Sequence, residues 1–155
     1  MRTDDPFDLQ RFLSAQEPVF ATVLDELRNG HKRSHWMWFV FPQLRGLGRS
    51  ATAGFYGIAS LDEAKAYLAH PTLGARLEQA TRAVLGVQGG TLHEIFGSPD
   101  DMKFRSSMTL FALAAGQADS AYHEALVRWC DGRMDDATVT LAGALAGAPP
   151  PPPRM

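Results

Sequence analysis

The sequence predicts an all-α fold, a single-domain multihelical bundle of about seven short helices. Three observations support this prediction. Helix-capping sequences precede several apolar stretches, apolar residues recur at the 3.6-residue spacing of an amphipathic helix, and no turn sequence typical of a β-hairpin separates alternating apolar runs. At 155 residues, with 45% hydrophobic and 21% charged residues, the chain has the length and composition of one globular domain.

Two helices are predicted before residue 30. Asp5–Pro6 is typical of an N-cap followed by a first-turn proline, and predicts a short helix through Leu13. Ser14–Glu17 has the spacing of a capping box, which predicts that the next helix begins near Pro18. Asn29–Gly30 is expected to end this helix.

The same signals mark the helices of the second half of the chain. Ser60–Glu63 and Thr91–Glu94 have the capping-box spacing, and Ser98 before Pro99 is typical of an N-cap and first-turn proline, with the helix reaching Ala115. Thr72 is the other predicted cap, Asp119 and Asp136 are each expected to start a helix, and the predicted breaks are Pro71, Gly97 and Gly132.

The expected domain covers residues 4–147, and the proline run in residues 148–155 is expected to be a disordered tail. The N-terminus lacks the apolar core of a signal peptide, and no apolar run approaches the roughly 20 residues of a membrane span. Cys130 is the one cysteine, so an internal disulfide is excluded and a buried structural thiol is expected. These features predict a cytoplasmic protein that does not bind a membrane.

The charges are distributed unevenly along the chain. Residues 28–61 contain no Asp or Glu but hold five basic residues, Arg28, Lys32, Arg33, Arg45 and Arg49, although the formal net charge of the whole chain is −2. Arg45 and Arg49 flank Gly46 and Gly48, so this loop is a candidate anion site. The overall acidity argues against nucleic acid as a partner, although binding through this acid-free window stays an alternative.

An aromatic run lies inside this window, in the segment Ser34–Gln43. Its periodicity fits either a buried strand or a helix that is apolar on every side. Ser34 as an N-cap and Pro42 as a stop favour a short helix, so His35–Phe41 is expected to be the buried central element of the bundle.

Three long motifs carry a resemblance to a known family. They are Lys32–Gly48 (KRSHWMWFVFPQLRGLG), Tyr67–Leu77 (YLAHPTLGARL) and Ile95–Phe111 (IFGSPDDMKFRSSMTLF), and they follow Asp5–Gln16 (DPFDLQRFLSAQ) in order. The chain resembles the DUF1810 family over about residues 4–142. The resemblance implies a mainly helical single domain, and it assigns no activity, substrate or catalytic residue.

The basic and aromatic residues predict a pocket for a small anionic or nucleotide-like ligand, with hydrolysis or transfer as the broadest chemistry. Arg33 and Arg45 are expected to hold phosphate or carboxylate, Trp36 or Trp38 to stack on the ligand, and His35 to orient or protonate it. Lys103, Arg105 and Ser107 on a later helix are expected to face the same cleft. The predicted ligand-binding residues are Arg33, His35, Trp36, Trp38, Gln43, Arg45, Lys103, Arg105 and Ser107, with His35 as the one catalytic candidate.

Other functions remain open at this point. The histidines show no metal-ligand spacing, and the glycine loop lacks the complete fingerprint of a dinucleotide site or a P-loop, so neither a metal nor a cofactor is expected. A non-catalytic protein-interaction or regulatory module is the main alternative, and an exposed aromatic patch without convergent polar groups would favour it.

Overall fold

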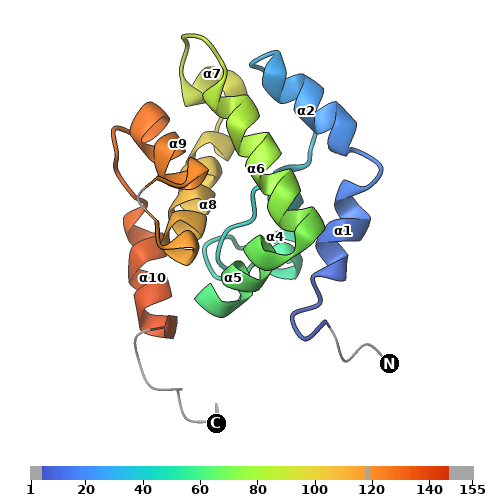
Figure 1. Ribbon diagram of the computed structural model, residues 1–155, viewed down its shortest axis with the longest axis vertical. Helices are drawn as coiled ribbons and strands as arrows, with labels where there is room; N and C mark the ends of the chain where they lie inside the picture. The colour runs from blue at the N-terminus through green and yellow to red at the C-terminus, as the bar shows by residue number, and fades with distance from the viewer. Residues whose placement is uncertain (1–4, 118, 147–155) are drawn as a thin grey trace.

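The computed structural model describes residues 5–117 and 119–146, and this part of the chain contains ten helices (Figure 1). Their bounds are α1 Gln10–Gln16, α2 Phe20–Arg28, α3 Met37–Val40, α4 Ala51–Tyr56, α5 Leu61–Ala69, α6 Pro71–Leu85, α7 Leu92–Phe96, α8 Asp100–Ala115, α9 Ala121–Cys130 and α10 Asp136–Ala146. These residues contain no strand, and one parallel β-bridge pairs Leu44 with Ile58. The all-α prediction is confirmed. The helix number exceeds the expected seven because α3, α4 and α7 span only four to six residues.

The longest helix, α8, is the centre of the bundle. Every residue from Ser106 to Ala112 is buried, because α5, α7, α9 and α10 all pack against α8. In Figure 1, α6 crosses the front of the molecule between α2 and α9, and it packs on α2, α5 and α9. A helix that is buried on nearly every side has little amphipathic pattern. For this reason the sequence predicted the helix itself but did not predict that α8 is the centre of the bundle.

The segment expected to be central belongs to the core only in part. Trp36, Met37, Val40 and Phe41 are each 1% exposed, whereas His35 is exposed. The prediction that Ser34 caps this helix is wrong: α3 begins at Met37, Trp36 occupies the N-cap position, and neither side chain caps the helix.

Most of the helix boundaries follow the capping signals. Thr91 and Glu94 form the predicted reciprocal capping box of α7, α8 ends at Ala115, and α10 begins at Asp136 as expected. Ser60 accepts from the backbone N–H of Glu63 and so caps α5. These signals are local, so neighbouring residues are enough to specify them.

Five predicted helix starts were wrong. The carboxylate of Asp5 accepts from the backbone N–H groups of Leu9 and Gln10, so α1 begins at Gln10 instead of Pro6. Helix α1 then runs through Ser14, and α2 begins at Phe20. The imidazole of His70 caps α6 in place of Thr72, and Pro99 takes the N-cap position of α8 in place of Ser98. Helix α9 begins at Ala121, with Ser120 as its cap, instead of at Asp119.

No helix of the described residues is long and apolar enough to cross a membrane. The proline-rich segment in residues 148–155, which the sequence predicts to be a tail, lies outside the described residues.

Candidate functional site

A buried carboxylate, that of Glu26 on α2, fixes the start of the aromatic segment. Its Oε1 accepts from the backbone N–H of Arg33 at 2.8 Å, from that of Ser34 at 3.1 Å and from the Trp36 indole at 2.9 Å. The Ser34 hydroxyl donates to Oε2 at 2.5 Å. Burial alone would raise the pKa of Glu26, but the hydrogen bonds from Ser34, Arg33 and Trp36 outweigh it and lower the pKa to about 2.

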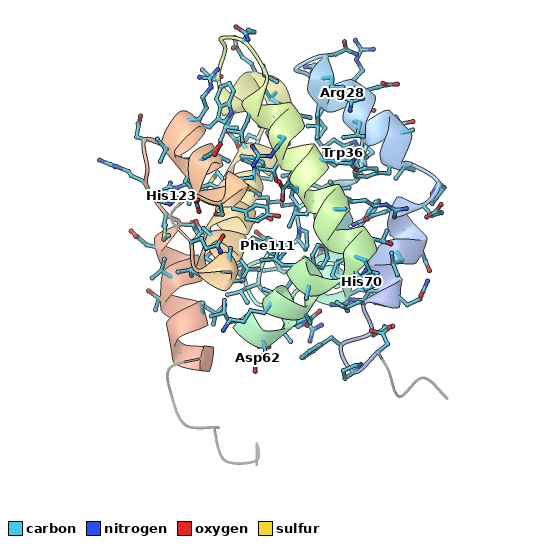
Figure 2. The ribbon with its side chains drawn as sticks, viewed as in Figure 1. Arg28, Trp36, Asp62, His70, Phe111 and His123 are labelled. Carbon is cyan, nitrogen blue, oxygen red and sulfur yellow. The ribbon has the colours of Figure 1, made fainter. Side chains whose placement is uncertain are left out.

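Trp36 is therefore an anchor of the core and does not line a ligand pocket. It is 1% exposed, its indole nitrogen is bonded to Glu26, and it lies beside α2 in Figure 2. The Lys32 ammonium lies 5.1 Å from the Trp36 ring centroid and 2.9 Å from Asp100 Oδ2 on α8. Residues 28–61 contain no acidic residue of their own. Two carboxylates that contact this segment, those of Glu26 and Asp100, come from other parts of the chain.

Trp38, two residues further on, lines a small hollow between α3, α4 and α8, which we call the Trp38 hollow. Its lining residues are Met37, Trp38, Phe41, Gln43, Ala53, Tyr56, Gly57 and Lys103. The cavity volume is about 10 Å³, which is room for one water molecule. The hollow brings together three of the predicted ligand-binding residues, Trp38, Gln43 and Lys103.

Several polar side chains converge on this aromatic hollow. The Lys103 ammonium lies 5.1 Å from the Trp38 ring centroid, and its one ion pair among the described residues joins it to Asp100 at 3.7 Å. The side chains of Trp38, Gln43 and Tyr56 make no hydrogen bond to any other described residue. Each therefore has unused capacity for donating or accepting a hydrogen bond.

Arg45 lies beside the hollow, and its guanidinium is held by the backbone. It donates to the carbonyl of Gly54 at 3.1 Å and to that of Gly57 at 3.0 Å. The same Gly57 carbonyl accepts from Arg11, which forms a buried ion pair with Glu63 at 2.8 Å. Gly57 has no room for a side chain, since an added Cβ would lie 2.7 Å from the Arg45 Cα. Arg45 is thus a structural tie between the glycine loop and α4.

The other predicted residues lie apart from the hollow. Arg33 and His35 are exposed, and neither lines it. Arg105 turns toward the connection between α9 and α10, where it donates to the carbonyls of Arg133 and Met134. Ser107 is fully buried, one helical turn from Lys103 on the same face of α8. Its hydroxyl is the one buried side-chain polar atom without a hydrogen-bond partner among the described residues.

The remaining reactive groups of the described residues offer neither a thiolate nor a metal site. Cys130 is half-buried, and burial raises the pKa of its thiol to about 11, so it is a thiol and not a thiolate at neutral pH. Within the described part of the chain, no group of three or more His, Cys, Asp or Glu side chains is arranged to hold a metal ion.

Comparison with known proteins adds the family. The family described as "Protein of unknown function (DUF1810)" matches residues 6–142 of the chain. The chain belongs to this family. A search of curated proteins gave no match. Among solved structures, the chain is similar to the conserved hypothetical protein Rv1873 from Mycobacterium tuberculosis, with 56% identity and a TM-score of 0.86. The match covers 88% of this chain and 97% of that one, so the DUF1810 fold is shared over nearly the whole of both.

Three residues that shape this part of the DUF1810 fold were not predicted from the sequence. Tyr56 lies inside the acid-free window, so its position was a usable signal, and it lines the hollow. Glu26 accepts a hydrogen bond from Trp36, and Asp100 forms an ion pair with Lys32. These contacts form only in the folded protein, and no local sequence pattern predicts either of them.

Proposed function

We propose that this protein binds a small anionic ligand that carries a flat ring, such as a nucleotide, at the Trp38 hollow. The observation that supports this proposal is the convergence of a lysine ammonium and three polar side chains without described partners on one aromatic surface. Exposed polar groups that converge on an apolar hollow are the usual composition of a small-molecule site. The proposal concerns binding, since His35, the catalytic candidate, does not line the hollow.

Each side chain has a defined part in this proposal. The half-buried Trp38 ring offers a face on which a planar group stacks, which contributes about 1–3 kcal/mol for a nucleobase. Lys103 contacts the phosphate or carboxylate, and Gln43 and Tyr56 form hydrogen bonds that orient the ligand. A ligand anion displaces Lys103 from Asp100 at little cost, because Lys32 still neutralises Asp100 at 2.9 Å. The buried hydroxyl of Ser107 lies one turn further along α8.

Binding requires the hollow to open, because a volume of about 10 Å³ holds no more than one water molecule. Helix α4 is the wall that moves in this proposal. Its six residues include no fully buried one, and Phe55, next to its last residue, is 56% exposed. Elements with few buried residues open at a low free-energy cost, so α4 and the loop before it swing outward while α3 and α8 stay in place. This movement breaks the hydrogen bond from Arg11 to the Phe55 carbonyl and the contact of the Tyr56 ring with Phe39.

We also propose that the protein works in the cytoplasm. The supporting observation is that Cys130 is a free thiol, which a reducing compartment preserves.

The proposal is tested by thermal unfolding of the wild type and of Lys103→Met with a panel of probes. The panel contains inorganic phosphate, acetate, ribose 5-phosphate, adenosine 5′-monophosphate and uncharged adenosine. A probe at about 100 times its dissociation constant stabilises the folded protein by roughly 2.7 kcal/mol, which raises the Tm by several degrees. We expect the mononucleotide to raise the Tm more than phosphate or adenosine does, and Lys103→Met to remove most of this shift.

Lys65→Met is the matched control, since Lys65 is an exposed lysine on α5 that does not line the hollow. It should respond to each probe as the wild type does. An unchanged Tm with every probe would contradict the proposal and favour an interaction module, as would a shift that Lys103→Met leaves intact.

A further inference from the structure

A second and larger concavity, which we call the Tyr122 cleft, lies away from the Trp38 hollow. It is bounded by the corner between α5 and α6, by the connection from α8 to α9, and by the first turn of α9. Its volume is about 540 Å³, and it shares no lining residue with the hollow. In Figure 2, His70 marks the corner between α5 and α6. The cleft is large enough for a small organic molecule without any opening movement.

Tyr122 is the buried polar side chain that reaches this cleft. The residue is only 5% exposed, and its ring lies 6.0 Å from that of Phe111, centroid to centroid. Its hydroxyl forms no hydrogen bond with any other described residue. Burial, followed by the negative charge of Glu78 in the cleft wall, raises the pKa of Tyr122 to about 12, so the hydroxyl is uncharged at neutral pH.

His70 also lines this cleft. Its Nδ1 accepts from the backbone N–H groups of Thr72 at 3.1 Å and Leu73 at 3.2 Å. A ring nitrogen that accepts two hydrogen bonds carries no hydrogen, so the hydrogen of the neutral ring is on Nε2. The cap on α6 therefore fixes both the tautomer and the orientation of the His70 ring.

The charges that line the cleft leave a negative excess. Arg82 is shared between Glu78 at 3.1 Å and Glu124 at 3.8 Å, so its positive charge is already balanced. Asp119, the other acidic residue of the lining, is exposed and forms no ion pair with a described residue. An anion in this cleft would be repelled by Glu78 and Asp119, and Arg82 is already paired. A cation could pair with the carboxylate of Asp119 and donate a hydrogen bond to the uncharged Tyr122 hydroxyl.

We propose that the Tyr122 cleft is a second binding site, for a small organic cation that carries an amine or a guanidinium group. The cationic group lies against Asp119 and donates to the Tyr122 hydroxyl, and His70 Nε2 donates to an acceptor elsewhere on the ligand. This site differs from the Trp38 hollow in place and in the sign of the ligand charge, so either proposal can fail without the other.

The test is a titration of the ¹⁵N-labelled full-length protein with agmatine, followed by the amide resonances of Ser120, Ala121 and Tyr122. We expect saturable shifts at these amides with a dissociation constant on the order of 1 mM, and no saturation with uncharged 1,4-butanediol or with glutarate. Asp119→Asn and Tyr122→Phe should each weaken agmatine binding about tenfold, as expected for the loss of a charge-assisted hydrogen bond.

Asp25→Asn on α2 is the matched control and should bind agmatine as the wild type does, because Asp25 is exposed and does not line the cleft. Both cleft variants leave the core intact, since Asp119 is exposed and phenylalanine keeps the ring that packs on Phe111. Equal binding of butanediol, the absence of saturable shifts, or unchanged affinity in Asp119→Asn would overturn the proposal.

Discussion

At the scale of single residues, Glu26 links the core to the candidate site. Four hydrogen bonds reach its carboxylate from the three residues Arg33, Ser34 and Trp36, and they turn the chain into α3 with Trp36 buried and Trp38 at the surface of the hollow. A buried carboxylate with this many donors is stable only in its charged form. The position of Trp38 therefore depends on the ionisation of a residue that does not touch the hollow.

The ionisation of Glu26 makes the stability of the fold depend on pH. The pKa is lowered from 4.5 to about 2, so the contribution is complete above pH 4.5 and is lost as the pH falls through about 2. This contribution amounts to about 3 kcal/mol. We expect Glu26→Gln to be less stable than the wild type at pH 7 and to lose less stability between pH 5 and pH 2, as measured by urea unfolding at each pH.

Glu124→Gln is the control for this experiment, since Glu124 is exposed and its one ion pair among the described residues is the 3.8 Å contact with Arg82. The free energy of unfolding of Glu124→Gln should depend on pH in the same way as that of the wild type. Parallel pH profiles for the wild type and Glu26→Gln would show that the hydrogen bonds of Glu26 do not depend on its charge.

At the scale of secondary structure, Gly74 and Gly143 separate two roles of glycine in a helix. An added Cβ at Gly74 on α6 would lie 2.2 Å from the backbone oxygen of Leu68, at the end of α5. An added Cβ at Gly143 on α10 would meet no described atom within 4 Å outside its own stretch of helix. The first glycine permits two helices to approach closely, whereas the second only weakens its helix.

Alanine should therefore have opposite effects at these two positions. Gly74→Ala forces α6 away from α5 and should destabilise the fold by about 1–3 kcal/mol. Gly143→Ala should stabilise it by up to about 1 kcal/mol, because alanine is the better helix former. Thermal unfolding of both variants measures the difference, and a stabilising Gly74→Ala would mean that the contact with Leu68 relaxes freely.

At the scale of the whole molecule, the sequence predicted the helix boundaries that depend on residues close together in the chain. The capping box of Thr91 and Glu94 lies within one turn, and its signal predicted α7 directly. The start of α10 at Asp136 was equally local. His70 was missed as a cap because histidine rarely takes that position, so the prediction favoured Thr72.

The candidate site depended on contacts that the sequence does not display. Trp38 and Lys103 were both predicted, but their meeting across the hollow is set by how α3 packs near α8. Arg45 and Arg105 have the charge that an anion site needs, yet backbone carbonyls occupy their guanidinium groups. Composition indicates which side chains are available, and tertiary packing decides which of them remain free.

The most direct test of the account is a titration with adenosine 5′-monophosphate, followed by the indole N–H resonances of the three tryptophans. The Trp36 indole donates to Glu26 and the Trp129 indole to the Val84 carbonyl, whereas the Trp38 indole has no acceptor among the described residues. Binding at the hollow should shift the Trp38 resonance saturably and leave the other two in place. A Trp38 resonance that stays fixed at saturating nucleotide, or three resonances that move together, would contradict the assignment of this site.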